Sequence, residues 1–133
     1  IREHEIAHRE FFKAALGSSA IASLDVDFSS IDFSSRSSVL GTAKVFEDLG
    51  VAAYNGAAYL IVNPDYLVLA GKIVSVEARH AAAIRDLLNP RSPDFAGDDV
   101  IDTSGLDRQM LPSQVIQAAN GFLSTKISAN NLA

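Results

Sequence analysis

The sequence predicts an all-α fold: a four-helix bundle with a long crossover loop and an extra C-terminal helix. Four segments repeat apolar residues at the three- and four-residue spacing that gives a helix one apolar face. Two copies of Glu-x-x-His, Glu5–His8 and Glu77–His80, lie on such faces, and Glu47 lies on the apolar face of a third segment. An unpaired carboxylate is costly to bury, so these positions indicate a site inside the bundle.

The first helix is expected over residues 1–16, because apolar or site residues recur at positions 1, 5, 8, 12 and 15. Gly17 suits the position that follows a helix end. Residues 18–38 are rich in serine and predict a long connection. About twenty extended residues span at most roughly 60 Å, more than the roughly 36 Å of a 24-residue helix. The connection can therefore cross the bundle from end to end, and the helices on either side of it can run parallel.

The second and third helices are predicted from their apolar stripes and their start signals. The second is expected over residues 38–61, after a cap at Ser37 or Ser38, and the third over 65–88, with Pro64 near its start. The glutamate on each stripe lies about ten residues into the second helix and about twelve into the third. The two carboxylates can therefore lie at one height in the bundle.

The last part of the chain is expected to be mostly irregular. Residues 94–110 are acidic and rich in turn residues, which predicts a surface segment. Pro112 suits the start of a final helix that would run through about residue 127. With 133 residues and 48% hydrophobic content, the chain is expected to form a single domain over residues 1–133.

Composition excludes several classes of function. The formal net charge is −5 and no basic cluster occurs, so nucleic-acid binding is not expected. The absence of cysteine excludes disulfides, iron–sulfur clusters and zinc–thiolate sites. No run of about 18 uninterrupted apolar residues occurs, so no membrane span is expected.

The candidate metal ligands are Glu5, His8, Glu47, Glu77 and His80. When their helices turn these stripes inward, the five side chains converge, and three buried carboxylates without cations would repel one another. Two divalent metal ions would offset that charge. Carboxylates and imidazoles suit iron or manganese, and zinc could also bind them.

A sixth ligand and a preceding helix are also expected. Dimetal carboxylate bundles take one Glu from each of two helices and one Glu-x-x-His from each of two others. This chain holds five of those six ligands, and its first residues already belong to a predicted helix. The first bundle helix is therefore expected to be missing from this chain, either cleaved, not part of the structure or supplied by a separate chain.

At these residues the chain resembles the ferritin-like family that includes plant desiccation-related proteins and fungal stress-response relatives. Three stretches carry the resemblance: EIAHR at 5–9, FEDLGVAAY at 46–54 and VEARHAAAIR at 76–85. The resemblance continues through the predicted Pro112 helix. It implies a ferritin-like bundle, a dimetal site on the five ligands above, and an extracytoplasmic (periplasmic or secreted) location, since many bacterial members carry twin-arginine export signals.

Two further residues are candidates for contact with the ligands. His4 lies four residues before His8, a spacing that two metal-binding histidines can share, yet it lies toward the solvated flank of the helix. It is interpreted as a solvated side chain or one that supports a ligand. Tyr54 lies two turns beyond Glu47 and is either a hydrogen-bond donor near the site or part of the core.

Two functions remain open from the sequence. The first is a dimetal protein that handles iron or consumes O₂ or peroxide as an oxidase or detoxifying module. The alternative is a non-catalytic stress- or desiccation-associated bundle that acts as a scaffold or interaction protein with a degenerate site. A homo-oligomer, or a separate chain that supplies the first helix, is the expected partner, because the incomplete bundle would expose an apolar groove.

Overall fold

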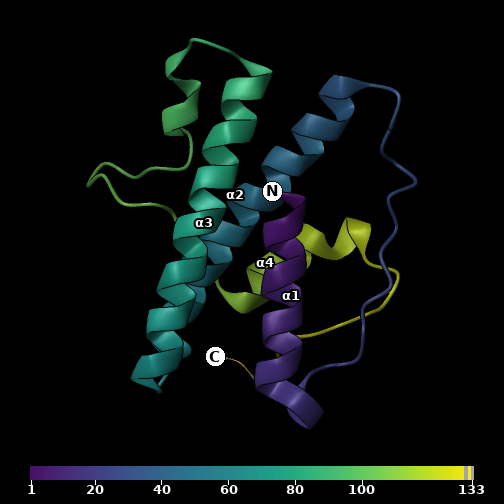
Figure 1. The fold of residues 1–133 in the computed structure, drawn as a ribbon, viewed down its shortest axis with the longest axis vertical. Helices are drawn as coiled ribbons and strands as arrows, with labels where there is room; N and C mark the ends of the chain where they lie inside the picture. The colour runs from purple at the N-terminus through teal and green to yellow at the C-terminus, as the bar shows by residue number, and fades with distance from the viewer. Residues whose placement is uncertain (131, 133) are drawn as a thin grey trace.

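The computed structural model describes residues 1–130 and residue 132 as an all-α fold (Figure 1). Its α-helices are α1 (Arg2–Leu16), α2 (Arg36–Ala57), α3 (Pro64–Leu88) and α4 (Pro112–Ala119). Short 3₁₀ turns occur at Gly17–Ser19, Ala58–Leu60, Pro93–Ala96 and Asn120–Phe122. The described residues contain two isolated β-bridges and no strand, so the predicted all-α class is confirmed. No helix among them is long and apolar enough to cross a membrane.

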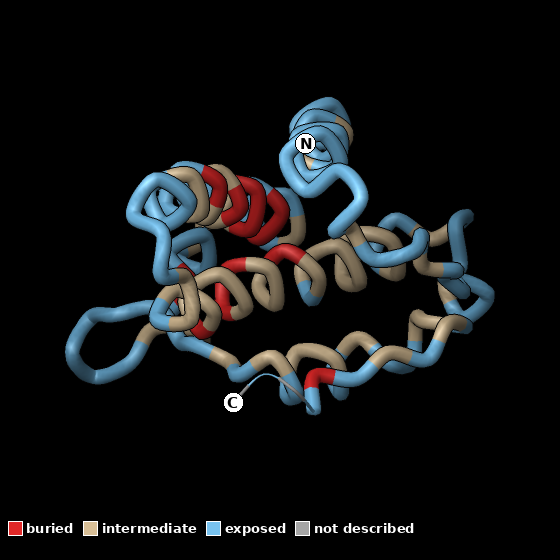
Figure 2. The backbone as a smooth tube through the Cα atoms, turned by 90° about the horizontal axis from the view of Figure 1, so that it is seen from below, coloured by how far each residue is buried: buried red, intermediate tan, exposed pale blue. Residues whose placement is uncertain are grey.

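Helices α2 and α3 form an antiparallel pair that holds most of the core (Figures 1 and 2). Each begins with a side-chain cap: the Ser35 hydroxyl accepts a hydrogen bond from the Ser38 N–H, and Asn63 accepts one from the Asp65 N–H. The buried apolar residues of the pair are Val51, Ala52, Ile73, Ala81 and Ile84. Glu47 on α2 and Glu77 and His80 on α3 are buried in the same pair of helices.

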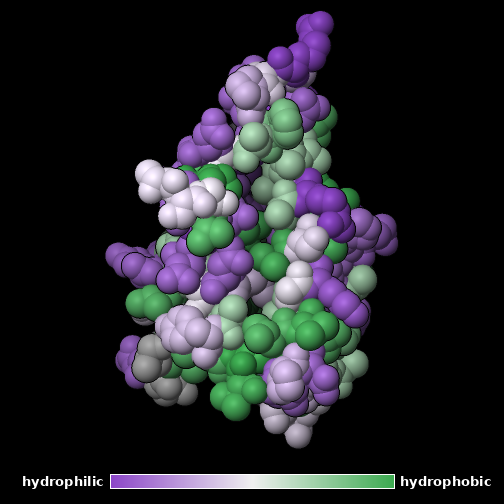
Figure 3. All heavy atoms as spheres, turned by 90° about the vertical axis from the view of Figure 1, so that its left-hand side faces the viewer, coloured by the Kyte–Doolittle hydropathy of each residue, from purple (hydrophilic) through white to green (hydrophobic). Residues whose placement is uncertain are grey.

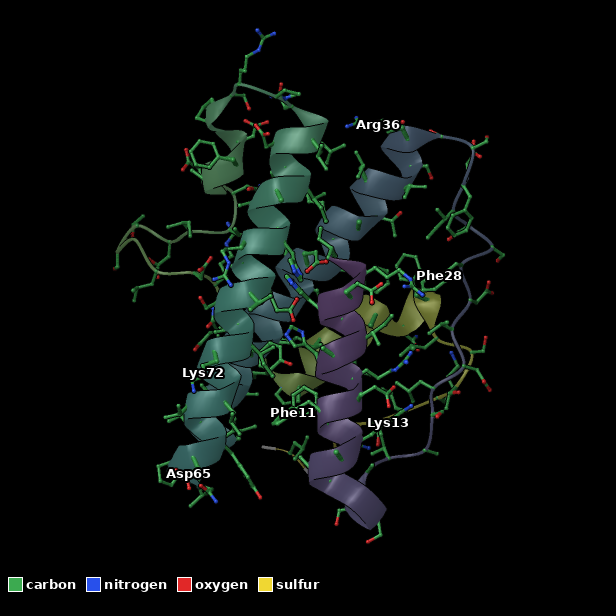
Figure 4. The ribbon with its side chains drawn as sticks, viewed as in Figure 1. Phe11, Lys13, Phe28, Arg36, Asp65 and Lys72 are labelled. Atoms are coloured by element: carbon green, nitrogen blue, oxygen red, sulfur yellow. The ribbon has the colours of Figure 1, made fainter. Side chains whose placement is uncertain are left out.

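Helix α1 lies beside this pair and has no buried residue (Figure 2). Phe11 lies on the side of α1 toward α3 and Lys13 on the opposite side (Figure 4). Its contacts with the pair include three polar side chains, His4, Glu5 and His8, which lie within 4 Å of side chains on α3. The position of α1 therefore depends on the polar cluster more than on a packed apolar interface.

The long connection runs from the end of α1 to the start of α2, and Figure 1 shows these two helices running in the same direction, as the length of the connection allows. The C-terminal segment pairs with the connection. The Asp27 N–H donates to the Phe122 carbonyl at 2.9 Å, and the Ser124 N–H donates to the Asp25 carbonyl at 2.9 Å. Rings of Phe28, Phe46 and Phe122 pack together at centroid distances of 4.8–6.3 Å.

This pairing explains a wrong prediction about the last helix. That helix was expected to run through about residue 127, but α4 ends at Ala119 and a 3₁₀ turn follows to Phe122. Leu123 instead forms a β-bridge with Val26, and the N–H groups of Ser124 and Thr125 donate to the Asp25 carbonyl. The α-helical part of α2 also ends at Ala57, before the expected end near residue 61, and continues as a 3₁₀ turn.

Apolar side chains gather on the surface at the end of the molecule where α3 begins (Figure 3). Val62, Leu67 and Val68 are among the exposed residues of this region.

Residues 93–110 lie against α2 and α3, and the Met110 N–H donates to the Ala52 carbonyl of α2 at 2.9 Å. The region predicted as an irregular surface segment is thus attached to α2 by its backbone.

The close approach of Met110 to α2 depends on Gly56. A Cβ at Gly56 would overlap the Met110 carbonyl, whereas a Cβ at Gly50 of the same helix would meet no atom within 4 Å. Gly56→Ala should therefore lower the free energy of unfolding by about 1–3 kcal/mol through overpacking. Gly50→Ala should be neutral or stabilising by up to about 1 kcal/mol, since alanine favours the helix. Urea unfolding of both variants checks this, and equal effects would contradict it.

Candidate metal centre

Three helices, α1, α2 and α3, bring the five predicted ligands to one place. The spacing of three in each Glu-x-x-His places both side chains on one side of its helix. Each of four residues offers one ligand atom, and these four atoms lie within 4.8 Å of one another. The four residues are Glu5, Glu47, Glu77 and His80. The described part of the chain therefore holds a cluster of Glu and His residues that could hold a metal ion.

His80 Nδ1 faces the carboxylates of all three helices. It lies 3.2 Å from Glu5 Oε1, 3.3 Å from Glu47 Oε2 and 3.6 Å from Glu77 Oε2. Glu47, Glu77 and His80 are 8%, 6% and 5% exposed, whereas the side chain of Glu5 is 47% exposed. The cluster is closed on the side of α2 and α3 and open to solvent on the side of α1.

His8 lies next to this cluster and is outside the group of four. Its Nδ1 is 3.0 Å from Glu77 Oε1 and 3.8 Å from Glu5 Oε1. The Glu77 carboxylate therefore lies between two imidazoles, with one oxygen near His8 and the other near His80. One carboxylate therefore lies within reach of both histidines.

The histidine nitrogens that face the carboxylates are orphaned. His8 Nδ1 and His80 Nδ1 are both buried and make no hydrogen bond of acceptable geometry, although carboxylate oxygens lie nearby. Buried polar atoms are rarely left without a partner. An imidazole nitrogen lone pair beside carboxylate oxygens is a donor set for a divalent cation, so these residues fit a metal site.

The electrostatics of the cluster also fit a metal site. Burial, together with the neighbouring Glu77 and Glu5 carboxyls, raises the pKa of Glu47 to about 8. Burial and Glu77 also raise the pKa of Glu5, and burial lowers the pKa of His80. At neutral pH, protons therefore reduce the negative charge of the cluster while His80 stays neutral. A divalent cation would take the place of those protons and bind a neutral imidazole.

The two supporting candidates lie close to the cluster. His4 Nδ1 is 2.9 Å from His80 Nε2, and the two nearly parallel rings have their centroids 5.2 Å apart. Tyr54 is half-buried, and burial with the charges of Glu77 and Glu5 raises its pKa to about 12. The Tyr54 phenol therefore stays protonated across the physiological range.

Sequence reasoning missed one residue that supports the site, Arg85. Its guanidinium is buried and donates to Asp48 at 2.7 Å and to Asp99 at 2.5 Å. Asp48 follows Glu47 on α2, so this ion pair ties α2 to α3 beside the cluster and also holds residues 93–100 against them. The available signal was the spacing of eight between Glu77 and Arg85, which places both near one face of α3.

The fold and the cluster define an all-α bundle with a carboxylate–histidine centre. The chain belongs to the ferritin-like domain family, which it matches over residues 1–90. That span includes α1, α2 and α3 and all five predicted ligands. Comparison with curated proteins and with solved structures found no match.

The metal-free protein should lose stability as the pH rises from about 6.5 to 8. Glu47 keeps its proton up to about pH 8 in the folded protein but has a pKa of 4.5 when unfolded, so the folded state binds more protons in this range. One additional proton bound by the folded state makes the free energy of unfolding fall by up to about 1.4 kcal/mol per pH unit. His80, whose pKa is lowered from 6.5, acts in the opposite direction only below that pH.

Urea unfolding with a chelator at pH 6.5, 7 and 8 measures this slope. Glu47→Gln removes the titrating carboxyl and should flatten it. A metal-loaded protein should instead gain stability with pH, because its ligands must be deprotonated. A metal-free wild type with the same slope as Glu47→Gln would contradict the prediction.

Proposed function

We propose that the protein is a ferritin-like dimetal-carboxylate protein that binds iron or manganese. The observation that carries this proposal is the Glu77 carboxylate between the two orphaned Nδ1 atoms of His8 and His80. His8 and His80, together with Glu5, Glu47 and Glu77, would hold the ions. Two divalent cations and three carboxylates together would have a net charge of +1.

The type of donor favours iron or manganese over softer metals. The cluster offers carboxylate oxygens and imidazole nitrogens, and the chain has no cysteine. Zinc also accepts these donors and is a useful redox-silent probe. Bound iron or manganese would supply electrons for the reduction of O₂ or peroxide, which makes an oxidase or peroxide-detoxifying role the proposed activity.

The surrounding residues suit such chemistry. Ile73 and Ile84 are buried one turn before Glu77 and one turn after His80 on α3, so they limit the access of water from that side. Tyr54 provides a neutral phenol near the carboxylates. The exposed flank of Glu5 leaves the side of α1 as the route by which ions and small oxidants would enter.

One observation favours the alternative, a non-catalytic bundle that serves as a scaffold or interaction protein in stress or desiccation. The raised pKa values of Glu47 and Glu5 mean that protons alone can make the cluster tolerable without a metal. Helix α1, which would carry two ligands, has no buried residue. An extracytoplasmic location, proposed from the family resemblance, would suit either role.

Metal content distinguishes the two functions. The protein is purified without chelators, its metal is measured by elemental analysis, and the metal-free form is titrated with manganese, with iron(II) under anaerobic conditions, and with zinc. We expect about two ions per chain, as in other bundles with this ligand set. Glu47→Ala should lose this binding, whereas Glu10→Ala, a change on the exposed face of α1, should keep it. Failure to bind all three metals would overturn the proposal.

A further inference from the structure

The facing ring nitrogens of His4 and His80 are close enough for a hydrogen bond between the two imidazoles. His4 Nδ1 lies 2.9 Å from His80 Nε2, a hydrogen-bond distance, and the planes of the two rings are only 16° apart. A hydrogen bond between two imidazole nitrogens needs one N–H donor and one lone-pair acceptor. The tautomers of the two rings are therefore coupled, and only two arrangements of neutral rings satisfy the contact.

The two arrangements differ in what His80 presents to the carboxylates. If His4 Nδ1–H donates to His80 Nε2, the proton of neutral His80 lies on Nδ1, which faces Glu5 and Glu47 at 3.2 and 3.3 Å. If His80 Nε2–H donates to His4 Nδ1, the His80 Nδ1 lone pair faces those carboxylates instead. Only the second arrangement lets His80 Nδ1 bind a cation.

We infer that His4 is a positioning residue, which accepts the Nε2 proton of His80 and thereby directs the Nδ1 lone pair of His80 to the metal. This inference rests on the proposed metal-binding function. Metal-ligating histidines usually donate their other ring N–H to a carboxylate, a backbone carbonyl or water. An imidazole acceptor fixes the ring in the same way without adding a fourth negative charge to three carboxylates.

The geometry argues against His4 as a ligand. Its Nδ1 is directed at the far edge of the His80 ring, away from the Nδ1 that faces the carboxylates, and His4 is not in the group of four that could hold an ion. The sequence His-Glu-x-x-His at residues 4–8 therefore contributes Glu5 and His8 to the cluster and His4 to the support of His80.

Two variants and one control test this role by zinc affinity. His4→Ala removes the acceptor and should weaken zinc binding about 10- to 100-fold, as loss of an outer partner usually does. His4→Asn places an amide oxygen near the former Nδ1 and should restore most of the affinity. Glu3→Ala, an exposed neighbour on α1 whose partner is Arg2, should leave the affinity unchanged. Thermal unfolding of the metal-free variants checks that the fold is kept.

Nitrogen-15 NMR of the wild-type protein provides a readout that does not depend on a variant. In the zinc-loaded protein, the His80 ring should show zinc on Nδ1 and the proton on Nε2. Zinc on Nε2, or unchanged affinity in His4→Ala, would overturn the role of His4 while leaving the metal site intact. A wild-type protein that binds no zinc, iron or manganese would overturn the proposed function and this inference together.

Discussion

Replacing Glu77 with glutamine should remove metal binding and, at the same time, stabilise the metal-free protein. Glu77 is buried and its oxygens lie 3.0 Å from His8 Nδ1 and 3.6 Å from His80 Nδ1. A ligand that serves both positions is expected to matter more than an outer partner, so the loss of affinity should exceed roughly 100-fold. Without metal, the substitution removes a buried negative charge and should raise the free energy of unfolding by about 1 kcal/mol.

The opposite signs of the two effects make this variant informative. Urea unfolding with a chelator measures the metal-free gain. With free metal at 100 times Kd, the wild type should gain about 2.7 kcal/mol for each ion bound and Glu77→Gln almost nothing. Glu3→Gln, an exposed substitution on α1, should change neither quantity. A destabilised metal-free Glu77→Gln that still binds metal would show that Glu77 has a structural role rather than a ligand role.

Removing the buried cation Arg85 should cost the protein about 3 kcal/mol of stability. Its side chain is 5% exposed and pairs with Asp48, whose side chain is 17% exposed. Arg85→Ala leaves Asp48 without its partner and also opens a cavity. Arg85→Met keeps much of the side-chain volume but not the charge, so a similar loss in both variants would assign the cost to the unpaired Asp48.

The same substitution should loosen the segment that Arg85 holds. Arg85 keeps the pKa of Asp99 at about 2, so this ion pair persists in mild acid. Amide hydrogen exchange over residues 93–100 should become faster in Arg85→Ala. Lys44, which contacts Asp99 at 3.2 Å and is partly exposed, provides the control, and Lys44→Ala should cost less than about 1 kcal/mol. Equal stability of Lys44→Ala and Arg85→Ala would contradict the prediction.

Local patterns were sufficient to predict most of the fold. The i, i+3 and i+4 stripes placed three helices that the structure has at α1, α2 and α3, because apolar periodicity and helix caps act within one segment of chain. The end of α4 could not be predicted in this way. It depends on hydrogen bonds between residues 122–125 and 25–27, which are about a hundred positions apart.

The same distinction between local pattern and tertiary contact applies to the candidate site. The sequence by itself determined which side chains share a helix face, since the spacing of Glu5 and His8, or of Glu77 and His80, is set by the helical turn. Only the tertiary structure decided that Glu77 lies between the two histidines, that His4 contacts His80, and that Arg85 pairs with Asp48. These contacts depend on the height and rotation of each helix relative to its neighbours, which are set by packing between helices.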